Sequence, residues 1–156
     1  MIPHERRDAA VSCWLTPSAL GSMPHGKSDA ETNSLWPASN CPQANEVFYI
    51  SGILTSGGDI KENRKVFERA QRMLLSKGCS VFNPIHIEWP IDPLKDDALF
   101  SYFMHFCVRA IPECDGMLML PNWQNSKGAK WEHRIAEMLS LRICYSPVLE
   151  ESDERQ

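Results

Sequence analysis

The chain has 156 residues and a net charge of −4, which suits one domain with its own core and little more. The negative charge lies at the ends, since residues 45–149 contain twelve basic and twelve acidic side chains. The sequence has neither a lysine or arginine block nor a long apolar segment, so neither a nucleic acid polymer nor a membrane is a favoured partner.

Six cysteines are spread along the chain without a CxxC pair and without the spacing to histidine that a zinc site needs. We expect them to be free and buried, and the sequence predicts neither a metal nor a cofactor. The N-terminus has charged residues but no following apolar run of the kind that a secretion signal requires. A reducing, cytoplasmic location is therefore expected.

Three segments of different composition divide the chain. Residues 1–44 are rich in Pro, Ser, Ala and Asn without a sustained helical or strand period, which predicts a disordered extension. Residues 45–149 have the apolar periodicity of a folded domain, and residues 150–156 form an acidic tail that is expected to be solvated. The functional domain is therefore expected within the middle segment.

Strand and helix patterns alternate through this domain. An apolar, β-rich run at 47–50 predicts the first strand, and a helix follows from Asp59 to about Lys77, where Gly78 ends it. Residues 79–82 predict the second strand. A strand, a helix and a strand within about forty residues favour a right-handed βαβ unit.

The second half of the domain continues the alternation. After a polar loop the sequence predicts a helix at 98–111, a buried strand at 116–120, a helix at 126–140 and a short strand at 142–145. The whole pattern predicts an α/β fold with a doubly wound, flavodoxin-like parallel sheet of about four strands in the order 2-1-3-4. Ligands are expected in the crevice above strands one and three.

The helix from Ala98 to Ile111 is apolar around nearly its whole circumference. One face is expected to pack on the sheet, and another needs a second partner. The simplest partner is a second copy of the chain, which predicts a homodimer through this helix. The alternative is a helix covered by the N-terminal extension.

A short motif follows the third strand. Ser126 is a plausible N-cap for a helix whose first turn contains Gly128, and Glu132 lies one turn further along. Unpaired N–H groups at a helix start favour an anion such as phosphate, and the glycine lets a ligand approach the backbone. The alternative is a solvated Glu132 and a structural Gly128. The apolar face of this helix is predicted to contain Trp131, Ile135, Met138 and Leu139.

The motifs Tyr49-Ile50-Ser51-Gly52, Asn83-Pro84 and Ser126-x-Gly128-Ala129-x-x-Glu132-His133 resemble those of a known family. It is a phage- and prophage-associated family of uncharacterised domains, grouped with the nucleoside 2-deoxyribosyltransferases and the deoxynucleoside-monophosphate N-glycosidases. The resemblance covers roughly residues 46–146, and its C-terminal motif is the more specific part.

The resemblance implies a reaction at the N-glycosidic bond of a nucleoside or nucleotide. Glu132 matches the glutamate that attacks the anomeric carbon in those enzymes, so a retaining glycosyl transfer is implied. Ser126 and the amides around Gly128 would bind a 5′-phosphate or 5′-hydroxyl. Tyr49 matches a tyrosine near the nucleophile, and Gly52 would allow close approach of the ligand.

Two departures from the family pattern concern the acid that assists the leaving base. The expected aspartate on the second helix is Cys107 here, and an apolar setting would keep its thiol protonated and inert. The acidic residue often found before the loop serine is Asn125. Either the long loop supplies the acid, or the pocket persists without turnover; the loop candidates are His86, Asp92, Asp96 and Asp97.

Three classes of function follow from these residues. The first is an enzyme acting on a nucleoside or nucleotide through Glu132 and Tyr49, with Asp97 and Asn125 near the substrate. Trp123 would stack on a base in this hypothesis, or else only cover the core. The second is a non-catalytic nucleotide-binding module, and the third is a structural protein that works through its N-terminal arm and second helix.

Overall fold

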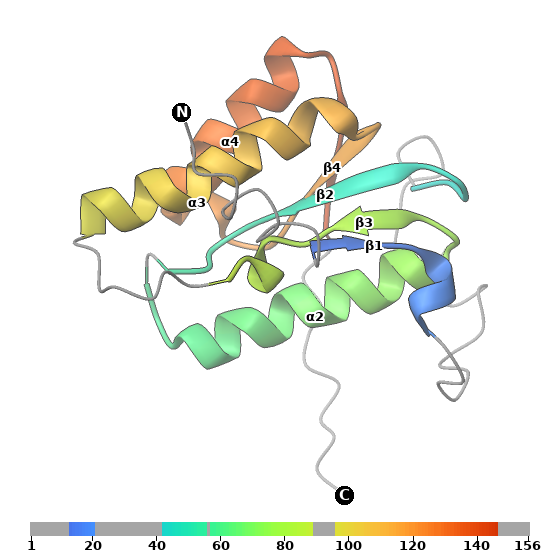
Figure 1. Ribbon diagram of the computed structural model, residues 1–156, viewed down its shortest axis with the longest axis horizontal. Helices are drawn as coiled ribbons and strands as arrows, with labels where there is room; N and C mark the ends of the chain where they lie inside the picture. The colour runs from blue at the N-terminus through green and yellow to red at the C-terminus, as the bar shows by residue number, and fades with distance from the viewer. Residues whose placement is uncertain (1–12, 21–41, 56, 89–95, 147–156) are drawn as a thin grey trace, which may run out of the picture.

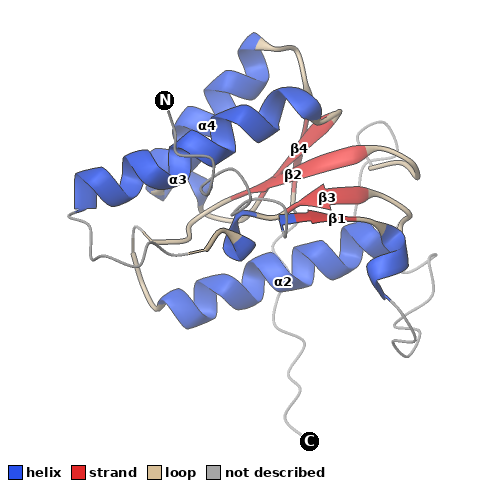
Figure 2. Ribbon diagram, viewed as in Figure 1, coloured by secondary structure: helices blue, strands red, loops and turns tan. Residues whose placement is uncertain are grey.

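The computed structural model describes residues 13–20, 42–55, 57–88 and 96–146. In these residues a five-stranded sheet lies between one helix on one face and two helices on the other (Figures 1 and 2). The single helix is α2 (Ile60–Ser76), and the pair is α3 (Asp96–Ala110) and α4 (Lys127–Met138). The predicted α/β class is therefore confirmed.

The strands run in the order β1-β3-β2-β4-β5 across the sheet. The pairs β2–β3, β2–β4 and β4–β5 are parallel, and β1–β3 is antiparallel, so the sheet is mixed. The carboxyl ends of the four parallel strands meet at one edge. The strands are β1 (Trp14–Leu15), β2 (Val47–Ser51), β3 (Ser80–Phe82), β4 (Gly116–Met119) and β5 (Arg142–Tyr145).

Strand β1 departs from the predicted disordered extension. Trp14 pairs with Phe82, their rings lie 4.8 Å apart, and the Asn83 backbone N donates to the Cys13 carbonyl O at 2.9 Å. These contacts satisfy backbone groups on the free edge of β3, which is why a short segment from the N-terminal region adds to the sheet. The rest of the predicted extension, residues 1–12 and 21–41, and the acidic tail lie outside the described residues.

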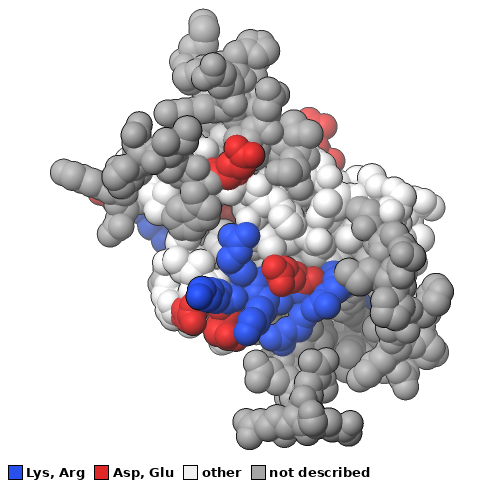
Figure 3. All heavy atoms as spheres, turned by 60° about the horizontal axis from the view of Figure 1, so that its bottom comes forward, with Lys and Arg blue, Asp and Glu red and all other residues white. Residues whose placement is uncertain are grey.

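Helix α2 forms where it was predicted. Asp59 is its N-cap and accepts from the Lys61 backbone N at 2.9 Å, while Gly78 follows its C-cap with a φ of +86°. Its outward side is rich in basic residues, and Figure 3 shows this face as a band of basic side chains interrupted by acidic ones. Helical spacing gathers these charges although they form no run in the sequence; they are Lys61, Arg64, Lys65, Arg69 and Arg72.

Two clusters of buried side chains pack on the opposite faces of the sheet. Phe48 and Ile50 belong to the cluster with α2, whereas Tyr49 belongs to the cluster with α3 and α4. Because side chains alternate along a strand, Ser51 shares the face of Tyr49. The end of β2 therefore presents two hydroxyl groups toward α3 and α4.

The inner face of α4 differs from the predicted one. Trp131 and Met138 are 51 % and 77 % exposed, and Leu139 is also exposed, whereas Ala129, Glu132 and Ala136 are buried. Two alanines let the helix backbone approach the sheet closely, so the carboxyl-bearing face turns inward. Of the predicted apolar face, Ile135 packs against the core, while Trp131, Met138 and Leu139 are left on the outside of the molecule.

No helix in the described parts of the chain combines the length and the apolar character that crossing a membrane requires.

Candidate functional site

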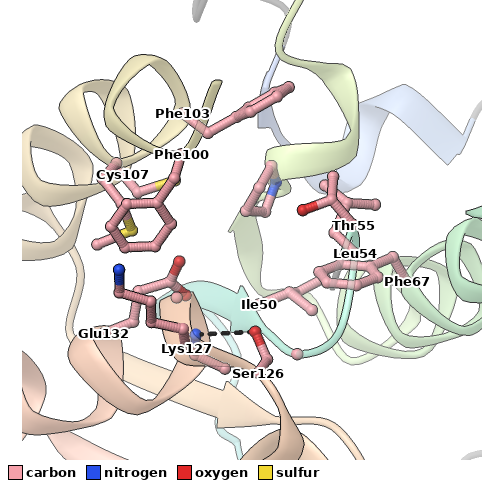
Figure 4. Close-up of a pocket in the computed structure, with 15 residues that line it drawn as sticks. Ile50, Leu54, Thr55, Phe67, Phe100, Phe103, Cys107, Ser126, Lys127 and Glu132 are labelled. Carbon is pink, nitrogen blue, oxygen red and sulfur yellow. Dashed lines mark hydrogen bonds between the residues drawn. The ribbon is translucent and has the colours of Figure 1, made fainter. Parts of the chain in front are cut away.

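A cavity of about 90 Å³ opens at the carboxyl edge of the sheet. Its volume is several times the roughly 10–15 Å³ that a single water needs. In Figure 4, side chains of α3 border one side, the segment after β2 and α2 border another, and the first turns of α4 border the third. The lining is mostly apolar: Ile50, Gly52, Leu54, Thr55, Phe67, Pro84, Phe100, Phe103, Met104, Cys107, Ser126, Lys127, Gly128, Ala129 and Glu132.

The carboxyl group of Glu132 lies inside this cavity. It projects from the second turn of α4, and only 7 % of the residue is exposed. Burial raises its pKa from 4.5 to about 7, and the nearby Ser51 and Tyr49 hydroxyls and Cys107 thiol, which can donate to the carboxylate, oppose that rise. Near neutral pH the carboxyl group is therefore partly protonated and partly ionised. Because Glu132 is buried, the alternative prediction of a solvated Glu132 is wrong.

Tyr49 and Ser51 bring two hydroxyl groups to the same place. Both residues are fully buried, and neither hydroxyl has a hydrogen bond of full geometry to a described residue. Both nevertheless lie close enough to Glu132 to favour its ionised form. Burial raises the pKa of Tyr49 well above its usual value, so this hydroxyl keeps its proton and is available to donate it in a hydrogen bond.

Cys107 stands on α3 where the resemblance leads one to expect an aspartate. It lines the cavity and is buried, and burial followed by the nearby Glu132 charge raises its thiol pKa well above the usual value. The thiol is therefore protonated at neutral pH, as we predicted from the apolar residues around Cys107 in the sequence. A thiol in this state is a weak donor to Glu132 and a poor acid for a leaving group.

The start of α4 forms as the sequence predicted. Ser126 is the N-cap, and its Oγ accepts from the Ala129 backbone N at 3.2 Å, shown as the dashed line in Figure 4. A Cβ built on Gly128 would lie 3.7 Å from both Met104 Sδ and Phe100 Cε2, an ordinary contact distance. The glycine therefore leaves space at the cavity wall without being required by packing.

Lys127 brings a cation to the same wall. Its Nζ lies 4.5 Å from the centre of the Phe100 ring, a cation–π distance. The ammonium group and the free amides of the first turn of α4 together favour a negatively charged ligand group at this end of the cavity.

Gly52 lines the cavity, but packing also demands a glycine there. A Cβ at this position would lie 2.8 Å from Leu120 Cβ, which is closer than real contacts allow. The sequence suggested Gly52 as a place where a ligand comes close to the backbone. In the structure, the side chain of Leu120, the residue after β4, also comes close to the backbone there.

Three predicted substrate-binding residues lie outside the described lining. Asp97 is exposed in the first turn of α3, and Asn125 is exposed in the short 3-10 helix η6 (Trp123–Asn125). Trp123 stacks on His133 with ring centres 4.4 Å apart. The indole therefore packs against α4, as in the alternative prediction that it covers the core.

None of the remaining acid candidates is among the described residues that line the cavity. His86 Nε2 lies 2.9 Å from Gln71 Oε1, and burial lowers the pKa of its ring. Asp92 lies outside the described residues, and Asp96 begins α3. Glu132 is the single acidic residue in the described lining.

Several site residues were not singled out as such from the sequence. Ser51 follows Tyr49 by two positions on one strand, so strand alternation was the signal that would have found it. Phe100, Phe103 and Met104 belong to a helix that is apolar on all sides, and the pattern does not reveal which of its side chains face a cavity.

The fold and the site together define an α/β protein with a buried carboxyl group at the ligand-binding edge of its sheet. Residues 46–145 match the family described as "Domain of unknown function (DUF4406)", and the chain belongs to this family. The matched region begins just before β2 and ends at β5, so it contains every lining residue of the cavity and excludes β1. A search of curated proteins finds no sequence that matches the chain. Across the described residues, no group of three His, Cys, Asp or Glu side chains suits a metal ion.

Proposed function

We propose that the protein cleaves or transfers the N-glycosidic bond of a nucleoside or nucleotide, with Glu132 as the nucleophile. The observation that carries the proposal is a buried carboxyl with a pKa of about 7 inside a cavity, beside two buried hydroxyls. Perturbed titratable groups in a cleft are typical of functional sites. The resemblance to nucleoside 2-deoxyribosyltransferase-like enzymes agrees with this chemistry, and we propose a distant relationship to them, including to their phage-associated members.

The proposed reaction has two steps. The Glu132 carboxylate attacks the anomeric carbon, the C–N bond breaks, and the base departs with the bonding electron pair and takes up a proton from a water molecule. Water or a second base then attacks the same carbon and frees the carboxylate. The hydroxyls of Tyr49 and Ser51 hold the carboxylate, while the apolar walls exclude water and offer Phe100 and Phe103 to a planar base.

The other end of the substrate would meet the first turn of α4. The amides around Gly128, with Lys127 beside them, favour a 5′-phosphate or 5′-hydroxyl oxygen. The sugar would then span the short distance from this turn to Glu132 in the next.

A second candidate function is a non-catalytic nucleotide-binding module on the same cavity. It is favoured by the single carboxyl in the described lining, because retaining glycosidases use two carboxyls and the Cys107 thiol is a poor replacement. If the protein catalyses the reaction, we expect it to act best on nucleosides whose base can leave without the help of a strong acid.

We also propose that the four parallel strands form a flavodoxin-like core and that the protein is cytoplasmic. The parallel pairing of β3, β2, β4 and β5 supports the first statement. The second is supported by five buried cysteines that are present as thiols and not as disulfides: Cys13, Cys79, Cys107, Cys114 and Cys144.

The test is incubation of the protein with a panel of deoxynucleosides and deoxynucleotides, followed by chromatography for free base. The enzyme hypothesis requires release by the wild type and none by Glu132→Gln. Glu137→Gln is the matched control, because Glu137 lies on the same helix with its side chain 59 % exposed. Saturable binding without release by any variant supports the binding module instead, and no binding at all contradicts both.

A further inference from the structure

The outward surface of α4 carries a stripe of large apolar side chains. Trp131 and Met138 lie seven residues apart, which is two turns, so both are on the same outward side of the helix, and both are exposed. Leu139 lies beside them at the C-cap. Soluble monomers seldom expose a contiguous apolar surface of this kind without an interaction to bury it.

Helix α3 extends the same surface. The first turn of α4 faces α3, since a Cβ on Gly128 would touch Met104 and Phe100, and the two helices lie side by side in Figure 1. Val108 follows Met104 by about one helical turn and is 42 % exposed. We name these exposed side chains the outer patch: Val108, Trp131, Met138 and Leu139.

We infer that the outer patch binds the outer patch of a second copy of this chain, with the two α4 helices antiparallel. A two-fold axis passing near Arg134 and Ile135 places Trp131 opposite Met138 of the partner subunit. This pairing buries Met138, the most exposed large apolar residue among the described ones, against the Trp131 indole of the other subunit.

The charges that flank the stripe are self-complementary in this arrangement. Glu137 of one subunit lies within about one turn of both Lys130 and Arg134 of the partner subunit. Opposite charges that flank an apolar seam select an antiparallel copy of the same helix, as they select partners in coiled coils. This charge pattern favours a second copy over an unrelated partner. The inference refines the expected homodimer through α3, because α4 supplies most of the contact, and it does not depend on the proposed function.

Sedimentation velocity of the full chain from about 1 to 200 μM tests the inference. We expect a concentration-dependent dimer whose dissociation constant rises more than about tenfold in Met138→Glu. Ile60→Glu is the matched control, since Ile60 is 40 % exposed on α2 across the sheet, and it leaves the dissociation constant unchanged. Circular dichroism checks that each variant keeps its helices.

A charge-reversal series tests the antiparallel geometry. Glu137→Lys weakens the dimer, and adding Lys130→Glu and Arg134→Glu to that variant restores it. A wild-type chain that stays monomeric at every concentration overturns the inference, including the case in which another segment of the same chain covers the patch. A dimer that Met138→Glu does not weaken also overturns it.

Discussion

Ser51 at the end of β2 is buried next to Glu132 of α4, and its hydroxyl favours the ionised form of the Glu132 carboxyl. The two residues come from opposite ends of the domain sequence. They meet because the carboxyl end of a parallel strand and the start of a helix share one edge of the sheet. The strength of the acid at Glu132 is thus set jointly by burial and by the strand beside it.

Ser51→Ala is expected to raise the pKa of Glu132 further above about 7, because it removes a donor to the carboxylate. A hydrogen bond to a charged group contributes on the order of 1.5 kcal/mol, so the carboxyl becomes about tenfold weaker as an acid. The measurement is a carbon-13 NMR titration of the glutamate side chains. Ser101→Ala, on the exposed side of α3, is the control, and equal titration curves for wild type and Ser51→Ala would contradict the assignment.

Glu132→Gln is expected to change how stability depends on pH. Below pH 4.5 the wild-type carboxyl is protonated in the folded and unfolded states. Between about 4.5 and 7 the unfolded state ionises first, so the wild type loses about 3 kcal/mol of stability as the pH rises, and the loss levels off above 7. Urea unfolding of both proteins at several pH values measures this difference. A wild type that gains stability relative to the variant over this range would show that the pKa is not raised.

Gly52→Ala is expected to destabilise the fold by about 1–3 kcal/mol, since the new Cβ would lie 2.8 Å from Leu120 Cβ. Thermal unfolding measures the loss. Unchanged stability would mean that the ends of β2 and β4 are less closely packed than the structure shows.

Gly128→Ala also changes a glycine of the cavity, but here we expect no loss of stability. Its Cβ meets neighbours at ordinary contact distance, and alanine favours a helix by about 1 kcal/mol over glycine, so stability is kept or increased. The methyl group occupies cavity space, so the affinity for a nucleotide falls. Calorimetric titration beside the thermal scan measures both effects, and undiminished affinity would place the ligand away from this turn.

The sequence predicted those parts of the fold that have strong local signals. The buried run of β2, the helix from Asp59 to Gly78 and the capped start of α4 at Ser126 all have them. The two-residue strand β1 was missed because it is too short for a strand period and exists only through its pairing with β3. Of the apolar face predicted for α4 only Ile135 packs against the core, because a pattern of large apolar residues does not reveal that two alanines and Glu132 form most of the buried side.

The candidate site was partly predictable for the same reason. Ser126, Gly128 and Glu132 lie within two turns of one helix, so their spacing alone brings them together. The walls from α3 and the Ser51 hydroxyl depend on tertiary packing. Asp97, Asn125 and Trp123 were assigned to the site from loops or helix ends, where the sequence does not fix the direction of a side chain.

The proposed reaction requires that Glu132 becomes covalently attached to the sugar. It is tested most directly by acid quenching during turnover of a deoxynucleotide, followed by mass spectrometry of the peptide that contains Glu132. We expect a deoxyribosyl adduct on this peptide in the wild type, absent in Glu132→Gln, together with release of free base. Base release by the Glu132→Gln variant at the wild-type rate would show that Glu132 is not the nucleophile.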